Sequence, residues 1–246
     1  MIRRAKTYVL AAVAVGMLAG VVANGQFAWA GAGGSGTSKE GYTDQFFLDD
    51  CTFSTRGSNR FFILEPNYRL ILRGEGKHGS DIELTITVLK QTQTVDGVET
   101  RVVEERETVD GELVEVSQNF FAICEQTNSL FYFGEQVDFY EDGIVVGHAG
   151  SWLAGEDDAE AGVFMPGIVL LGARYQEETA PDVAMDRGEI VSLDEVVETP
   201  AGNFGGVLKI METTPLEPGV VEYKYWAPNV GLIQDGELTL EEYGFL

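Results

Sequence analysis

The sequence predicts a mostly β protein, an antiparallel meander forming a curved sheet, half-barrel or barrel, with few short helices. Apolar and polar residues alternate along several segments, and Asp-Gly pairs recur between these segments. No segment shows a sustained helical period with capping residues. Because a sheet of eight or more strands usually curls, we expect a concave side that holds side chains or a ligand.

The first 30 residues are predicted to be a cleavable export signal peptide. Residues 3–6 carry three positive charges, residues 8–22 form an uncharged apolar run, and residues 28–30 match the small-x-small pattern of signal peptidase sites. The run falls short of the roughly 20 residues that cross a bilayer, which favours cleavage over a membrane anchor. We expect an exported protein, periplasmic or extracellular, with no transmembrane segment after cleavage.

Residues 31–45 are predicted to be a flexible N-terminal segment, followed by a single β-rich domain over 46–246. The segment begins with a Gly- and Ser-rich stretch that has little to bury. The whole chain is 44% apolar and 11% aromatic, which is ample for a packed core.

The strands are predicted from alternation and from turn residues. Ile82, Leu84, Ile86 and Val88 alternate with polar neighbours. Asp96-Gly97, Asp110-Gly111 and Asp142-Gly143 predict hairpin turns. Further strands are expected at 112–123, 130–134, 144–149, 172–179, 187–199, 206–214, 219–227 and 230–235. Across the turn formed near residues 215–219, Glu217 and Lys224 are expected to pair.

The chain is strongly acidic. It has 16 basic and 40 acidic residues; without the three basic residues of the signal, 13 face 40, a net charge of −27. Such a surface repels nucleic acid and anionic lipid. No Lys or Arg lies between Arg106 and Arg174, so carboxylates there must be solvated, screened by salt or bridged by cations.

One acidic loop in this half is a candidate calcium site. Glu156, Asp157, Asp158 and Glu160 place four carboxylates within five residues, and hard cations prefer several oxygens from a short loop. The spacing does not match an EF-hand, and a solvated loop is the alternative. The cofactor is therefore predicted to be none, or calcium.

Cys51 and Cys124 are the two cysteines of the chain. In an oxidising exported compartment an even count favours a disulfide. Two separate buried thiols are the alternative, since sequence does not place the two Cα atoms within bridging distance.

Catalytic motifs are absent from the sequence. It contains no Gly-x-Ser-x-Gly and no His-Glu-x-x-His. A Ser-His-Asp triad would need His148 with Ser151 or another serine, and a histidine on a strand edge is the favoured interpretation. No catalytic residue is assigned, and the prediction leans against an enzyme.

The aromatic residues at strand positions have two interpretations. Core packing is their usual role, whereas an open half-barrel would let some line an apolar groove for lipid or a hydrophobic peptide. The sets are Phe120-Phe121, Phe131-Tyr132-Phe133, Phe139-Tyr140 and Tyr223, Tyr225, Trp226.

From about Asn59 to Tyr243 the chain resembles an uncharacterised family of exported bacterial β-rich proteins of the lipoprotein-carrier-like half-barrel type. The blocks that carry the resemblance are residues 62–66, 131–135, 150–152, 212–219 and 225–232. The resemblance implies an extracytoplasmic β domain and no established activity or substrate. The sequence departs from the family pattern at Leu153, where Gly-Ser-Trp is usually followed by a charged residue, and in the loop Glu156-Asp157-Asp158.

Taken together, the sequence favours an exported, acidic, non-enzymatic binding or interaction module whose partner is an unknown protein or a small apolar ligand. One alternative is a calcium- or salt-dependent envelope protein. Another is a hydrolase with a carboxylate-based site, although paired acids can be found in any chain with 40 of them.

Overall fold

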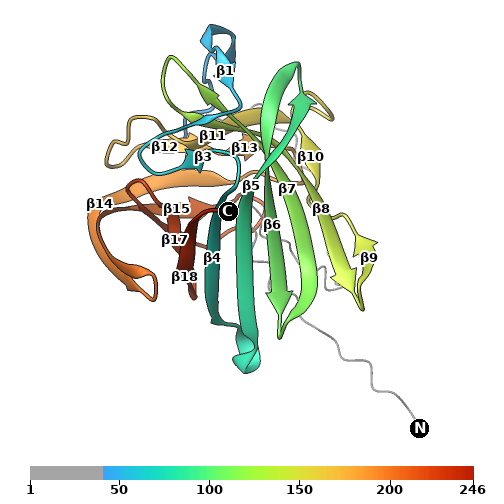
Figure 1. Cartoon of the computed structure of the whole chain (residues 1–246). Coiled ribbons are helices and arrows are strands. Elements are labelled where there is room, and N and C mark those ends of the chain that lie inside the picture. Colours follow the sequence, from blue (N-terminus) through green and yellow to red (C-terminus); the bar gives the residue numbers. More distant parts are fainter. Residues whose placement is uncertain (1–40) are drawn as a thin grey trace.

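The computed structural model describes residues 41–246 (Figure 1). The expected signal peptide and the lead-in up to residue 40 lie outside the described residues. About 63% of the structure is β-strand, and the described part has two 3₁₀ helices of three residues each, η1 (Leu48–Asp50) and η2 (Lys77–Gly79). The predicted fold class is confirmed.

The strands follow one another with short connections along most of the chain. They are β1 (Phe53–Ser54), β2 (Gly57–Ser58), β3 (Ile63–Leu64), β4 (Tyr68–Glu75), β5 (Asp81–Val95), β6 (Val98–Val109), β7 (Glu112–Cys124), β8 (Leu130–Glu141), β9 (Ile144–Gly147), β10 (Trp152–Leu153), β11 (Glu160–Met165), β12 (Arg174–Gln176), β13 (Glu178–Thr179), β14 (Arg187–Thr199), β15 (Gly202–Thr213), β16 (Glu222–Ala227), β17 (Gly231–Asp235) and β18 (Leu238–Phe245).

The three predicted Asp-Gly turns join β5 to β6, β6 to β7 and β8 to β9. In each turn both residues have positive φ, as in Asp96 (φ 46°) and Gly97 (φ 77°). A two-residue turn with two left-handed positions matches the twist of the flanking strands, and Asp-Gly adopts it at low cost. The turns therefore confirm the meander that the sequence predicts.

Thirteen strands form one continuous path that nearly closes into a barrel, in the order β12-β14-β15-β16-β17-β18-β4-β5-β6-β7-β8-β11-β13. The two ends of this path, β12 and β13, are consecutive in the chain and are separated only by Glu177. The predicted strand 172–179 is thus two strands, because the chain changes partner there from β14 to β11. The seam lies where this change occurs.

The segment before η1 pairs with β12, at one side of the seam. Thr43 forms a parallel bridge with Tyr175, accepting a hydrogen bond from the Gln176 amide and donating one to the Arg174 carbonyl, both of 2.9 Å. Part of the segment 31–45, which was expected to be flexible, is therefore paired with β12.

The apolar core fills one part of the barrel. Ile82, Leu84, Ile86 and Val88 are all buried, as their alternation predicts. A cluster of aromatic rings lies beside them, with centroids 4.8 to 6.1 Å apart, formed by Phe62, Phe121, Tyr132, Phe164 and Trp226. The cavity among these residues measures about 20 Å³, roughly the room of one water molecule. Core packing is therefore the role of these aromatic side chains.

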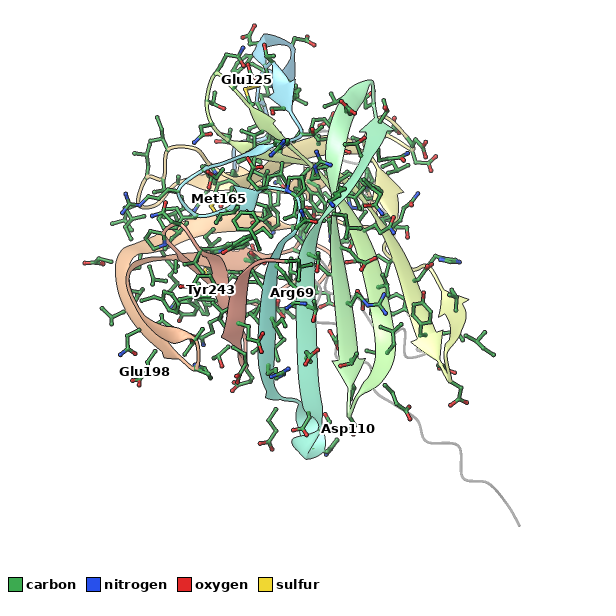
Figure 2. The ribbon with its side chains drawn as sticks, in the orientation of Figure 1. Arg69, Asp110, Glu125, Met165, Glu198 and Tyr243 are labelled. Carbon is green, nitrogen blue, oxygen red and sulfur yellow. A yellow bond between two sulfur atoms is a disulfide. The ribbon has the colours of Figure 1, made fainter. Side chains whose placement is uncertain are left out.

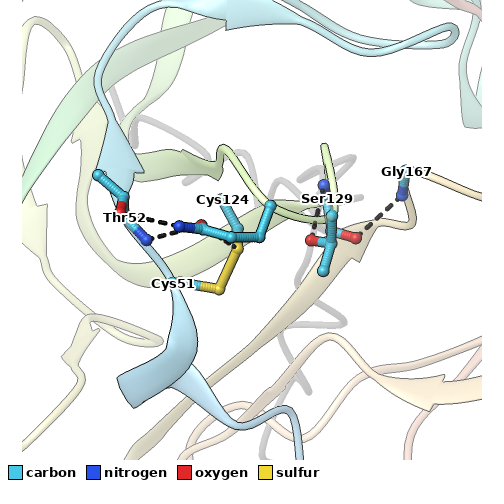
Figure 3. The surroundings of a disulfide bond; sticks show 7 residues. Cys51, Thr52, Cys124, Ser129 and Gly167 are labelled. Carbon is cyan, nitrogen blue, oxygen red and sulfur yellow. Dashed lines mark hydrogen bonds between the residues drawn. A yellow bond between two sulfur atoms is a disulfide. The ribbon is translucent and has the colours of Figure 1, made fainter.

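Cys51 and Cys124 form a disulfide, with their Cα atoms 5.2 Å apart (Figure 3). It ties the segment before β1 to the end of β7. Beside it, the amide of Thr52 donates a hydrogen bond of 2.8 Å to Gln126, and the Gln126 side chain donates one of 2.9 Å to the Thr52 hydroxyl. Of the two alternatives for the cysteines, the structure has the disulfide.

Candidate functional site

A cleft of about 210 Å³ opens between β8, β10 and the two loops at residues 154–159 and 180–183. Its lining residues are Glu135, Gln136, Ser151, Trp152, Leu153, Glu156, Asp157, Ala159, Ala180, Pro181 and Val183. These described residues include three with carboxyl groups and no Lys, Arg or His. We call this the acidic cleft.

Glu135 is the inner carboxylate of the acidic cleft. Its side chain is 0% exposed, and neither oxygen has a partner with hydrogen-bond geometry among the described residues. Burial, followed by repulsion from Glu105 of β6 and Glu115 of β7, raises the pKa of Glu135 well above its ordinary value, although the Ser117 hydroxyl partly offsets the rise. A buried carboxylate without a partner is costly to the fold, which makes Glu135 a candidate functional residue.

The backbone at Gly134 brings β10 against Glu135. Gly134 has φ 150°, and a Cβ there would lie 2.6 Å from the Trp152 carbonyl oxygen. Only glycine allows this close approach of two strands. The Gly-Glu pair in the block at residues 131–135 thus places a carboxylate directly beside Trp152, its partner in the β8–β10 ladder.

Trp152 and Ser151 form the wall of the acidic cleft that comes from β10 and its preceding turn. The Trp152 ring is 6% exposed and packs edge-on against Tyr132, with centroids 5.2 Å apart. Its indole N–H is buried and has no acceptor among the described residues. Ser151 Oγ accepts a hydrogen bond of 2.9 Å from the Val137 amide, which fixes this turn on β8.

Glu156 and Asp157 stand at the exposed rim of the cleft. Their loop is compact, because the Gly155 amide donates to the Ala159 carbonyl and the Ala159 amide donates to the Glu156 carbonyl. Of the four carboxylates proposed for calcium, these two line the cleft. Asp158 and Glu160 are exposed and do not. Residues 41–246 contain no group of three or more acidic, His or Cys side chains placed to hold one metal ion.

A second set of buried acids lies along the seam. Glu177 and Glu178 are each 1% exposed. Burial raises the pKa of both well above the ordinary value; repulsion by Glu212 adds to the rise at Glu177, and repulsion by Asp186 adds to it at Glu178. The pKa of Asp186 rises to about 7, chiefly through burial. Glu178 accepts a hydrogen bond of 2.6 Å from the Asp186 amide, but its other carboxylate oxygen has no partner among the described residues.

Lys224 supplies a buried positive charge beside these acids. Its Nζ lies 2.7 Å from a Glu212 carboxylate oxygen, and the side chain is 1% exposed. Burial opposes the charged form, but attraction by Glu212, Asp235 and Glu177 outweighs it and raises the pKa of Lys224 well above the ordinary value. The expected pair with Glu217 is wrong, since Lys224 points into the barrel toward Glu212.

The histidine considered for a triad lies at the surface. His148 Nδ1 is 2.8 Å from Asp138 Oδ1 and 3.1 Å from the Val137 carbonyl oxygen, on a side chain that is 66% exposed. The Ser151 hydroxyl is bonded to the Val137 amide instead. The structure therefore joins His148 to a carboxylate and places Ser151 in the neighbouring cleft.

Sequence reasoning missed Glu135, Glu177, Glu178 and the Lys224–Glu212 pair. A signal for Glu135 does exist, because it interrupts the run Leu130–Val137, which is otherwise apolar apart from Gln136. In a chain with 40 acidic residues, however, a single Glu on a predicted strand is ordinarily assigned to the solvent face.

Comparison of the chain with family models, with curated proteins and with solved structures found no match. Over the residues that the structure describes, no helix has the length and apolar character needed to cross a membrane.

Proposed function

We propose that this protein is an exported, non-enzymatic binding protein and that its ligand occupies the acidic cleft. The observation that carries the proposal is Glu135, a fully buried carboxylate at the inner end of the cleft whose oxygens have no partner with hydrogen-bond geometry within residues 41–246. Buried polar groups in native proteins are nearly always paired, so an exception is a candidate for pairing with a ligand. The disulfide and the signal-like N-terminus support export.

The filled core leaves the acidic cleft as the better place for a ligand. An apolar ligand would need room that the aromatic cluster does not leave, since the cavity there measures about 20 Å³. The acidic cleft is ten times larger, at about 210 Å³, and it reaches solvent at Glu156 and Asp157. Typical small-molecule sites measure about 300 to 1,000 Å³, so the cleft suits a small ligand or one side chain of a larger partner.

The two tryptophans of residues 31–246 provide the test, because Trp152 lines the cleft and Trp226 lies in the core. We would screen a fragment library of mixed charge by recording the two indole N–H signals in NMR spectra, with Trp152→Phe to assign them. A ligand in the cleft should shift the Trp152 signal and leave that of Trp226 unchanged.

A substitution at the mouth of the cleft supplies the control. Val183→Phe should block these shifts, whereas Val196→Phe, at an exposed position of β14, should preserve them. If no fragment moves the Trp152 signal selectively, the cleft is not the binding site. Catalytic turnover of a bound ester or glycoside would instead support the carboxylate-based hydrolase.

A further inference from the structure

The acidic cleft has carboxyl groups at its two ends and apolar side chains between them, and this arrangement restricts which ligands the cleft can bind. Among the described lining residues, all the titratable side chains carry carboxyl groups, with Glu135 inside and Glu156 and Asp157 at the rim. Between them lie apolar side chains, among them Leu153, Pro181 and Val183. An anionic ligand would meet like charge at the exposed carboxylates Glu156 and Asp157 as it enters the cleft, which costs binding energy.

The inner end of the cleft lacks a partner for negative charge. Neither carboxylate oxygen of Glu135 has a donor with hydrogen-bond geometry among the described residues, although Ser117 lies near enough to favour the charged form, and no described Lys, Arg or His lines the cleft. A donor that carries a positive charge would satisfy both oxygens and would form the stronger, charge-assisted kind of hydrogen bond. The nearby Trp152 ring adds an aromatic surface to which cations are attracted.

A metal ion fits this arrangement less well than an organic cation. Calcium takes six to eight oxygens, and the described residues contain no group of three acidic, His or Cys side chains placed around one ion. An ammonium group needs only a few acceptors, and a hydrocarbon chain attached to it would lie against Leu153 and Val183.

We propose that the acidic cleft binds an alkylammonium group, with its nitrogen at Glu135 and its hydrocarbon chain between Leu153, Pro181 and Val183. This inference rests on the proposed function, since it names the ligand chemistry of the same cleft. The group has two sources, a free small amine or a lysine side chain of a protein partner. Both present an ammonium on a short hydrocarbon chain.

The test measures dissociation constants from the Trp152 indole signal at constant ionic strength. The probes are n-pentylamine, N-acetyl-lysine methylamide, n-pentanol, hexanoate and calcium chloride. We expect n-pentylamine to bind at least about tenfold more tightly than n-pentanol, and hexanoate more weakly still, by the usual strength of hydrogen bonds to charged groups. Tight binding of n-pentylamine alone would identify a free amine, whereas equal binding of the lysine derivative would indicate a protein side chain.

Isosteric variants test the role of each carboxylate. Glu135→Gln should weaken n-pentylamine binding about 10- to 100-fold, and the exposed Asp157→Asn about twofold to fivefold. Glu198→Gln is the matched control, since Glu198 lies on the β14–β15 hairpin, far from β10 (Figures 1 and 2).

Several results would overturn the inference while leaving the proposed function intact. The first is tighter binding of n-pentanol or hexanoate than of n-pentylamine, as measured from the Trp152 signal. The second is displacement of n-pentylamine by calcium at equal ionic strength. The third is unchanged n-pentylamine binding in a folded Glu135→Gln variant. If neither these probes nor any fragment moves the Trp152 signal, the proposed function fails as well.

Discussion

Glu135, Glu177 and Glu178 each keep at least one buried carboxylate oxygen that has no hydrogen-bond partner among the described residues. Such groups cost folding free energy when they ionise, and proteins usually avoid them. Here they lie beside the acidic cleft and along the seam of the barrel rather than in the aromatic core. Part of the barrel interior is therefore polar.

Glu135→Gln should stabilise the free protein, and the gain should grow with pH. The pKa of Glu135 is higher in the folded protein than in the unfolded chain. Between these two pKa values the folded state holds a proton that the unfolded state has lost, so the stability of the wild type falls as pH rises from the unfolded pKa to the folded pKa. Glutamine does not titrate and escapes this loss. We expect a gain on the order of 1 to 3 kcal/mol at pH 8 and little gain at pH 5, measured by urea unfolding. A gain in stability that is independent of pH would contradict the raised pKa of Glu135.

Lys224→Met should strongly destabilise the protein, because it removes the cation that pairs with Glu212 and that attracts the nearby buried acids Asp235 and Glu177. The expected loss is about 3 to 5 kcal/mol at pH 7, the usual effect of breaking a buried pair on one side. The double variant Lys224→Met/Glu212→Leu should recover much of this loss. If the single and double variants unfold at the same denaturant concentration, the Lys224–Glu212 pair is not what holds this region.

At the scale of single elements, hairpins were the most predictable part of the fold. Asp-Gly turns need only two residues to specify their geometry, so the hairpins β5–β6, β6–β7 and β8–β9 follow directly from the sequence. Among the strands longer than two residues, β4, β11 and β18 were not predicted; nor were the two-residue strands β1, β2, β3 and β10. The pairings of β11 with β8 and of β18 with β4 both contain register shifts that break the period-two pattern, at Val163/Met165 and at Leu240/Glu242.

The Cys51–Cys124 disulfide should stabilise the attachment of η1 and β1 to β7. It closes a loop with a sequence separation of 73, for which the chain-entropy model gives a stabilisation of roughly 4 kcal/mol. Cys51→Ser/Cys124→Ser should therefore unfold at lower urea, and reduction should shift the wild type to the same midpoint. Reductant should leave the double variant unchanged, since the chain has only two cysteines.

At the scale of the whole molecule, the buried acids predict a protein that is more stable in mild acid than in mild base. Glu115, Asp186 and Asp235 have pKa values raised to about 7, mainly by burial, while their unfolded values lie near 4. The folded state therefore binds more protons than the unfolded state across this interval, and its stability falls as pH rises from about 4 to 7.

This pH dependence can be separated from repulsion among surface charges. Unfolding free energies measured at pH 5, 6, 7 and 8 in about 1 M salt should still decline, because salt screens exposed charges much more than buried ones. If the unfolding free energy no longer depends on pH in high salt, repulsion among surface charges causes the decline instead.

The sequence alone determined the β class, the hairpin turns, the alternating face of β5 and the acidic character of the chain. These properties depend on neighbouring residues or on composition, which are present in the sequence itself. The calcium loop, the export signal and the family resemblance remain predictions.

Only the tertiary structure decided which acids are buried and where a cleft forms. Glu135 becomes a cleft residue because Gly134 lets β10 approach, and Glu177 is buried because the chain changes sheet partners at that residue. Lys224 meets Glu212 rather than Glu217 because the register of β15 against β16 brings Glu212 and Lys224 into adjoining rows. Such contacts depend on strand pairing between distant segments, which period and composition do not specify.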